Sequence, residues 1–154
     1  MNIEESIVAL DFNAKDCNEV ILALAEQLHK AGYVGASYGE ATVARETIHP
    51  TGLPTKPIYI AIPHADAEDV ISSALAYAAL KTPVMFRNMV EPEEELPVEM
   101  VFMIANDSPE EQVKSLRRLA TIFGDPERLV QLKQLTQAGL VVEWLKTALE
   151  QVGQ

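Results

Sequence analysis

The run Tyr-Ile-Ala-Ile at residues 59–62, ended by Pro63, is the stretch from which the fold can be worked out. A compact apolar run is typical of a short strand, and proline ends it because it has no amide hydrogen for the sheet ladder. Other apolar runs have the same character. They lie at residues 73–80, 84–86 and 98–105, the last between Pro97 and Asn106.

Helical patterns lie on both sides of these strands. Three segments begin like a capping box, with a serine or aspartate three residues before a glutamate: Asp16 with Glu19, Ser37 with Glu40, and Ser108 with Glu111. Apolar stripes and terminal glycines predict helices over about 16–32, 37–48, 108–124, 126–135 and 137–151. Helices before and after the strands predict an α/β fold, a mixed β-sheet sandwiched between helices.

Composition limits the classes of protein that fit. With 154 residues, 48% of them hydrophobic and 23% charged, the chain suits one globular domain, and we expect residues 1–154 to form it. No apolar run approaches the ~20 residues that span a bilayer, and no leader pattern follows Met1, so we expect a cytoplasmic protein without membrane insertion. A net charge of -11 argues against sequence-independent nucleic-acid binding.

Two further features have simple structural interpretations. Cys17 is the only cysteine, which excludes an internal disulfide, and its position in a predicted helix favours a buried, inert thiol. The acidic residues between Glu91 and Glu95 are expected in a solvated loop between two strands.

The three histidines differ in their predicted surroundings. His29 lies in the last turn of a predicted helix, where it complements the helix dipole. His49 precedes Pro50 in the loop before a strand, and its role is open. His64 follows the strand and Pro63 directly, which places it rigidly at a sheet edge accessible to ligands and partners.

Phosphoryl transfer is a chemistry that suits such a histidine. Neutral imidazole is a good nucleophile near pH 7, because its unperturbed pKa is about 6.5. The transferred group needs compensation of its oxygen charge, and the planar fork of an arginine supplies it. Arg45 is the candidate, although an arginine at a helix C-terminus also serves the helix dipole alone.

Three motifs together resemble a known family: Arg45-Glu46, Pro50-Thr51-Gly52-Leu53 and Ile60-Ala61-Ile62-Pro63-His64. Their order is similar to the fructose/mannitol-type enzyme IIA domain of the bacterial phosphoenolpyruvate-dependent sugar phosphotransferase system, over nearly the whole chain. The resemblance implies that His64 accepts a phosphoryl group from the phosphocarrier HPr and gives it to a IIB component, which feeds a IIC permease. It also implies phosphate binding by Arg45, with no cofactor and no metal.

The sequence departs from this family at one position. Mannitol- and fructose-type members have a second active-site histidine where this chain has Gln112. A glutamine still hydrogen-bonds a phosphate oxygen but does not titrate. Galactitol-type IIA proteins are similar in this substitution, so the resemblance favours a galactitol-type member. If His49 approaches His64, it would take the place of the missing histidine.

Three alternatives remain open from the sequence. A nitrogen-related regulatory IIA-like phosphoprotein would have the same histidine motif. A pure docking module would bind partners without phosphorylation. A metal-dependent hydrolase would use His64, Asp66 and Glu68 on one side of an extended strand, with Asp69 or His49 as a further ligand.

Overall fold

The structure is a computed structural model, and it describes residues 1–153. Two short 3-10 turns, η1 and η2, accompany five strands and five helices. In chain order the elements are η1 (Glu5–Ile7), β1 (Val8–Phe12), α1 (Cys17–Lys30), α2 (Tyr38–Ile48), β2 (Gly52–Leu53), β3 (Ile60–Ala61), η2 (Ala67–Asp69), β4 (Ala74–Arg87), β5 (Glu95–Ala105), α3 (Pro109–Phe123), α4 (Pro126–Gln134) and α5 (Ala138–Val152).

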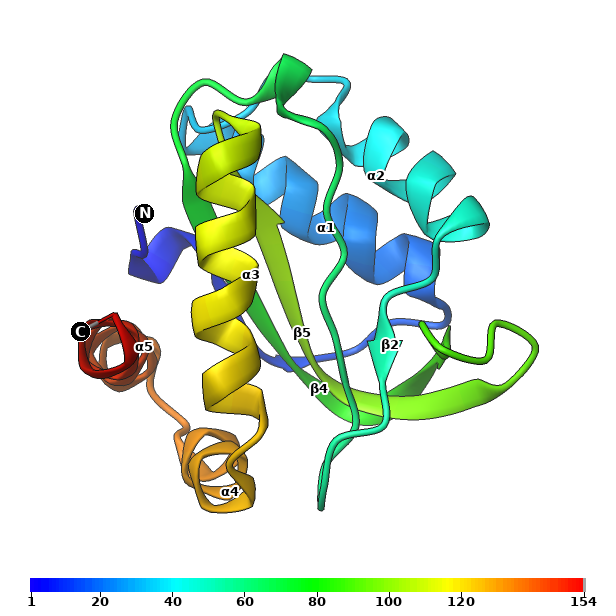
Figure 1. Cartoon of the computed structure of the whole chain (residues 1–154), viewed down its shortest axis with the longest axis vertical. Helices are drawn as coiled ribbons and strands as arrows, with labels where there is room; N and C mark the ends of the chain where they lie inside the picture. Colours follow the sequence, from blue (N-terminus) through cyan, green and yellow to red (C-terminus); the bar gives the residue numbers. More distant parts are fainter. Residues whose placement is uncertain (154) are drawn as a thin grey trace.

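The five strands form one mixed sheet in the order β1-β4-β5-β3-β2. The long strands β4 and β5 are antiparallel and form its centre, whereas β1 joins β4 in parallel and β3 joins β5 in parallel. Helices α1 and α2 lie on one side of this sheet and α3 on the other, as Figure 1 shows. The predicted mixed sheet between helices is therefore confirmed.

Alternation along the central strands explains why both faces are covered. Ala74, Ala76 and Ala78 of β4 belong to the core under α1, whereas Leu75 and Tyr77 belong to the core on the opposite face. Successive strand residues point to opposite faces, so small alanines let α1 approach the sheet and larger side chains fill the space on the other side.

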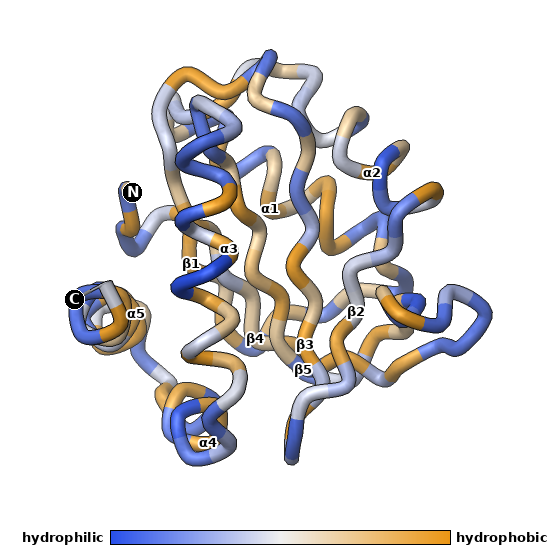
Figure 2. The backbone as a smooth tube through the Cα atoms, viewed as in Figure 1, coloured by the Kyte–Doolittle hydropathy of each residue, from blue (hydrophilic) through white to orange (hydrophobic). Residues whose placement is uncertain are grey.

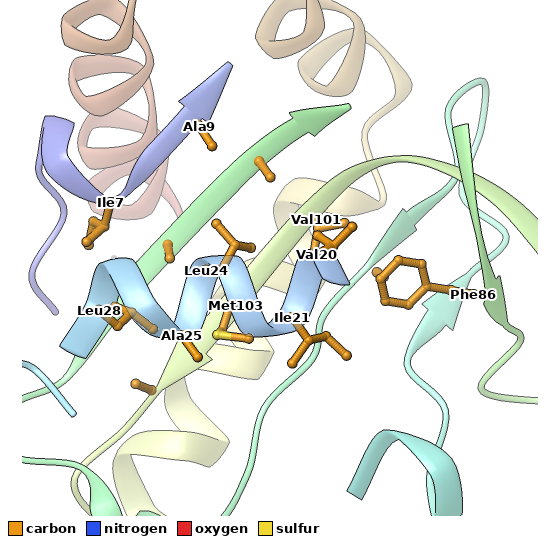
Figure 3. Close-up of a cluster of buried hydrophobic side chains, with 14 of the residues drawn as sticks. Ile7, Ala9, Val20, Ile21, Leu24, Ala25, Leu28, Phe86, Val101 and Met103 are labelled. Atoms are coloured by element: carbon orange, nitrogen blue, oxygen red, sulfur yellow. The ribbon is translucent and has the colours of Figure 1, made fainter. Parts of the chain in front are cut away.

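The core beneath α1 joins an amphipathic helix to β5. Figure 3 shows Val20, Leu24 and Leu28 of α1 lying over the strands, with Val101 and Met103 nearby. All five side chains are buried. Full burial of an aliphatic side chain contributes about 1.5–3 kcal/mol, so this face holds α1 firmly on the sheet.

The second core lies between the sheet and the three C-terminal helices. Tyr77, Phe102 and Phe123 form an aromatic row, with ring centroids 5.1 and 4.7 Å apart. In Figure 2 the central strands are mainly orange, whereas α3 and α4 alternate between blue and orange turns. That alternation is typical of helices with one face on a core and the other in solvent.

The structure shows which of the three predicted helix caps form. The Asp16 and Ser108 side chains accept hydrogen bonds from the amides of Glu19 and Glu111, as predicted. Ser37 is the N-cap residue of α2, as predicted, but its side chain makes no capping hydrogen bond and instead donates to Asp69.

Three further expectations need correction, and two strands were not predicted. Residues 73–80 and 84–86 belong to a single strand, β4, and the unpredicted strands are β1 and the two-residue β2. Strand β1 is irregular, with a register shift and a φ of 51° at Asp11, which obscures its pattern. Glu95 begins β5 rather than lying in the loop. Cys17 is half-buried at the first position of α1, and burial raises the pKa of its thiol.

No helix among residues 1–153 is both long enough and apolar enough to cross a membrane.

Candidate functional site

His64 lies just past β3, at the sheet end where β5 also finishes. The pairing of β3 with β5 continues beyond the strand, because the amide of Ile104 donates to the Pro63 carbonyl at 3.2 Å and His64 forms a bridge with Ile104. The side chain is only 6% exposed. A histidine that is this buried and fixed by ladder geometry has few alternative conformations.

One hydrogen bond determines which ring nitrogen of His64 is reactive. Nδ1 lies 2.7 Å from the backbone carbonyl oxygen of Ile62. A carbonyl only accepts, so Nδ1 holds the proton and the neutral ring keeps its lone pair on Nε2. The arrangement therefore leaves Nε2 as the ring nitrogen with a free lone pair.

The surroundings keep this imidazole neutral. Burial is the largest influence and lowers the pKa of His64; the Ile62 carbonyl raises it, the charge of Arg45 lowers it and Asp66 raises it. The net effect is a pKa below the ordinary value of about 6.5. The nucleophilic form consequently predominates at pH 7.

Arg45 and His49 lie together beside the histidine loop, which is the segment of residues 63–68 that follows β3 and carries His64. They line a hollow of about 420 Å³ between α2 and the segment after β3, whose walls include Ala65 and Asp66. Arg45 is half-buried in the last turn of α2, and His49 is the exposed residue that ends this helix. The hollow thus brings two of the predicted site residues close to Ala65, which directly follows His64.

Gln112 lies on the other side of the histidine loop. It lines a second hollow of about 470 Å³, where Ala65, Asp66 and Glu68 form the opposite wall. Figure 1 shows the chain after β3 rising between α3 and α2, so residues 65–68 separate the two hollows. Arg45 and Gln112 therefore flank the segment that follows His64 from opposite sides.

Tyr38 is a site residue that the sequence did not indicate. Its hydroxyl donates to the carbonyl of Ile104 at 2.7 Å and accepts from the amide of Ala65 at 3.2 Å. Burial raises the pKa of Tyr38 to about 12, so the phenol keeps its proton and performs both roles. The side chain is completely buried and joins α2, β5 and the residue after His64.

Arg45 and Glu46 are neighbours with different roles: Arg45 lines the hollow, and Glu46 stabilises the fold. Glu46 is buried and accepts hydrogen bonds from the amide and the hydroxyl of Thr51, at 2.8 and 2.7 Å. Burial raises the pKa of Glu46. Glu46 thereby fixes the turn between α2 and β2, and Arg45, one residue earlier, faces the hollow.

The metal-dependent hydrolase alternative requires residues 64–68 to form an extended strand, and the structure does not have that geometry there. Residues 67–69 form the 3-10 turn η2, so Asp66 and Glu68 do not alternate along a strand as expected. Within residues 1–153 no three His, Cys, Asp or Glu side chains gather in a way that would hold a metal ion.

The fold and the site define a small α/β protein with a buried, neutral histidine at a sheet edge and an arginine beside it. Such a site is suited to nucleophilic transfer of an anionic group. The sequence model of the phosphoenolpyruvate-dependent sugar phosphotransferase system, EIIA 2 family, matches residues 1–147, and the chain belongs to this family. The resemblance to the enzyme IIA family that the sequence indicated is therefore confirmed.

Individual relatives agree with this assignment. The galactitol-specific EIIA component of Escherichia coli K12 is 27% identical over 135 residues, which covers 88% of this chain and 89% of that protein. The crystal structure of IIA mannitol from Escherichia coli has a TM-score of 0.76 at 25% identity, covering 97% and 99% of the two chains. The complex of IIA and phosphorylated IIB for mannitol, also from Escherichia coli, contains a chain with a TM-score of 0.75 at 24% identity, covering 95% and 98%.

Tyr38→Phe is predicted to lower the free energy of unfolding by about 1–3 kcal/mol, because the Ala65 amide loses a buried acceptor and the Ile104 carbonyl a donor. Urea denaturation measures this change. Tyr33→Phe is the matched control, since its hydroxyl donates to Glu4 in a part-buried position and its loss is expected to cost less. Equal effects of the two substitutions would contradict the assigned role of Tyr38.

Proposed function

We propose that this protein is a phosphocarrier that accepts a phosphoryl group on Nε2 of His64 and passes it to a partner protein. The hydrogen bond from Nδ1 to Ile62 is the observation that supports this most directly, because it leaves Nε2 as the nucleophile. The chain is one IIA domain over residues 1–154 in this proposal.

The transfer step is a single exchange of bonds at phosphorus. The lone pair of Nε2 attacks the phosphorus of a phosphohistidine on the donor, the donor P–N bond breaks, and its electron pair returns to the donor ring. The proton on Nδ1 stays against the Ile62 carbonyl, which stabilises the positive charge that the ring acquires. In onward transfer a nucleophile of the acceptor attacks the phosphorus, the Nε2–P bond breaks and its electron pair returns to the His64 ring. Neither step calls for a cofactor or a metal in this proposal.

Charge compensation comes from groups on both sides of the histidine loop. Arg45 is near enough that its charge influences His64, and its guanidinium presents a donor fork to the phosphoryl oxygens. Gln112 supplies a neutral hydrogen bond from the other hollow. His49 lines the hollow with Arg45 and is a further candidate for contact with the bound phosphoryl group.

Family membership supports the partner assignments. We assign the donor as the phosphocarrier HPr and the acceptor as a IIB component that serves a IIC permease. In this proposal the protein is cytoplasmic and meets these partners there. The mannitol IIA relative was solved in complex with phosphorylated IIB, which supports the IIB assignment. The galactitol-specific relative and the glutamine at position 112 favour galactitol as the sugar.

Intact-mass spectrometry after incubation with phosphoenolpyruvate, enzyme I and HPr tests this function. The wild type is expected to gain one acid-labile phosphoryl adduct, and His64→Ala none, since the variant lacks the nucleophile. His29→Ala is the matched control and is expected to be modified like the wild type, because His29 binds the Val34 carbonyl outside the site. A well-folded wild type without an adduct would refute the phosphocarrier assignment.

Arg45→Gln is predicted to slow phosphoryl acceptance on the order of 10²-fold, because charge stabilisation of the transferred group is lost. The pKa of His64 rises in this variant, since a positive charge that disfavours the imidazolium is removed. Rapid-quench kinetics and an NMR titration of His64 measure the two effects. Arg45→Lys, which keeps the charge but not the fork, should be intermediate in rate. A wild-type rate for Arg45→Gln would exclude Arg45 from the site.

A further inference from the structure

A buried polar chain ends at Gln112. Asn106, directly after β5, donates from Nδ2 to Oε1 of Gln112 at 2.6 Å. Ser115 of α3 donates from its hydroxyl to Oδ1 of Asn106 at 3.0 Å. Asn106 is 2% exposed and Ser115 is 6% exposed, so neither amide nor hydroxyl has solvent as a ready alternative partner.

We propose that Asn106 is a positioning residue that turns the amide of Gln112 so that its NH₂ group faces the phosphoryl group on His64. This inference rests on the proposed function and assigns a role to two residues outside the predicted site. Asn106 acts through Gln112 and does not itself touch the transferred group.

The direction of the amide matters because its two ends are chemically opposite. The oxygen of a glutamine side chain only accepts hydrogen bonds, whereas its nitrogen only donates. Phosphoryl oxygens are acceptors. With Oε1 held by Asn106, the NH₂ group of Gln112 remains for the hollow that Ala65 and Asp66 also line. The reverse orientation would present a partly negative oxygen to an anion.

Ser115 is the second side-chain partner of Asn106. Its hydroxyl donates to Oδ1 of Asn106, while Nδ2 of Asn106 points to Gln112. Gln112 and Ser115 are three residues apart on α3, so both lie on the same face of the helix and reach one side chain at the end of β5.

This arrangement gives the site a donor that does not depend on pH. A histidine at position 112 would change its charge and its donor capacity between about pH 5 and 8. The oriented amide of Gln112 keeps two N–H donors throughout that range. A histidine would need protonation to have N–H donors on both ring nitrogens. By orienting Gln112, Asn106 gives the site its N–H donors without any protonation.

The test is a double-mutant cycle on the full chain with phosphorylated HPr as donor. An ionised aspartate only accepts, so Asn106→Asp turns the NH₂ group of Gln112 inward and its oxygen toward the phosphoryl group. We expect acceptance to slow about tenfold, the factor for one lost hydrogen bond. In a Gln112→Leu background the same substitution should have a clearly smaller effect, which reports only its added charge.

Equal slowing by Asn106→Asp in both backgrounds would overturn the proposal. A second readout is the side-chain amide ¹⁵N resonance of Gln112, which should shift on phosphorylation in the wild type and not in Asn106→Asp; the absence of a shift in the wild type would also overturn it.

If Asn106→Asp does not fold, the same double-mutant cycle is measured with Ser115→Ala in its place. It removes one of the two side-chain partners of Asn106, which loosens that side chain, and should slow acceptance a few-fold while Gln112 is present. The same slowing in the Gln112→Leu background would again contradict the orientation. Failure of the proposed function is distinct from all these results, because the wild type would then gain no phosphoryl adduct at all.

Discussion

The parallel pairing of β3 with β5 is the constraint on which the site depends. Strand β3 has only two residues, yet its ladder continues past Pro63 through the amide of Ile104 and ends with His64 opposite that residue. The same extension brings the Ile62 carbonyl to Nδ1 of His64. A two-residue strand between β5 and the edge strand β2 thereby fixes the position and the tautomer of one side chain, and the two covered faces of β5 hold that strand in place.

The groups around His64 divide between those that hold the histidine in place and those suited to bind an anionic group beside it. Tyr38 joins the histidine loop to α2 and β5. Arg45 offers a cation from one hollow and Gln112 an amide from the other, on either side of residues 65–68. Burial lowers the pKa of His64 and so keeps the imidazole neutral.

The sequence located all five α-helices, because caps such as Asp16 and Ser108 and apolar stripes are local signals. It missed β1, whose pattern is broken by an irregular register, and the two-residue strand β2. It placed Ser37 correctly at the start of α2 but not its hydroxyl, which donates to the distant Asp69. His64 and Arg45 stood out by residue type and motif. Tyr38 and Asn106 did not, since a buried hydroxyl or amide has no periodic pattern and Tyr38 meets Ile104 across 66 residues.

The most direct test of the account is the ring chemistry of His64 in the phosphorylated protein. A ¹H–¹⁵N NMR spectrum of the histidine rings distinguishes a phosphorylated Nε2 from a phosphorylated Nδ1. We predict that phosphorus is bonded to Nε2 of His64 while Nδ1 keeps its proton against the Ile62 carbonyl. Phosphorus on Nδ1, or on His29 or His49, would contradict the claim that this one backbone hydrogen bond selects the nucleophile.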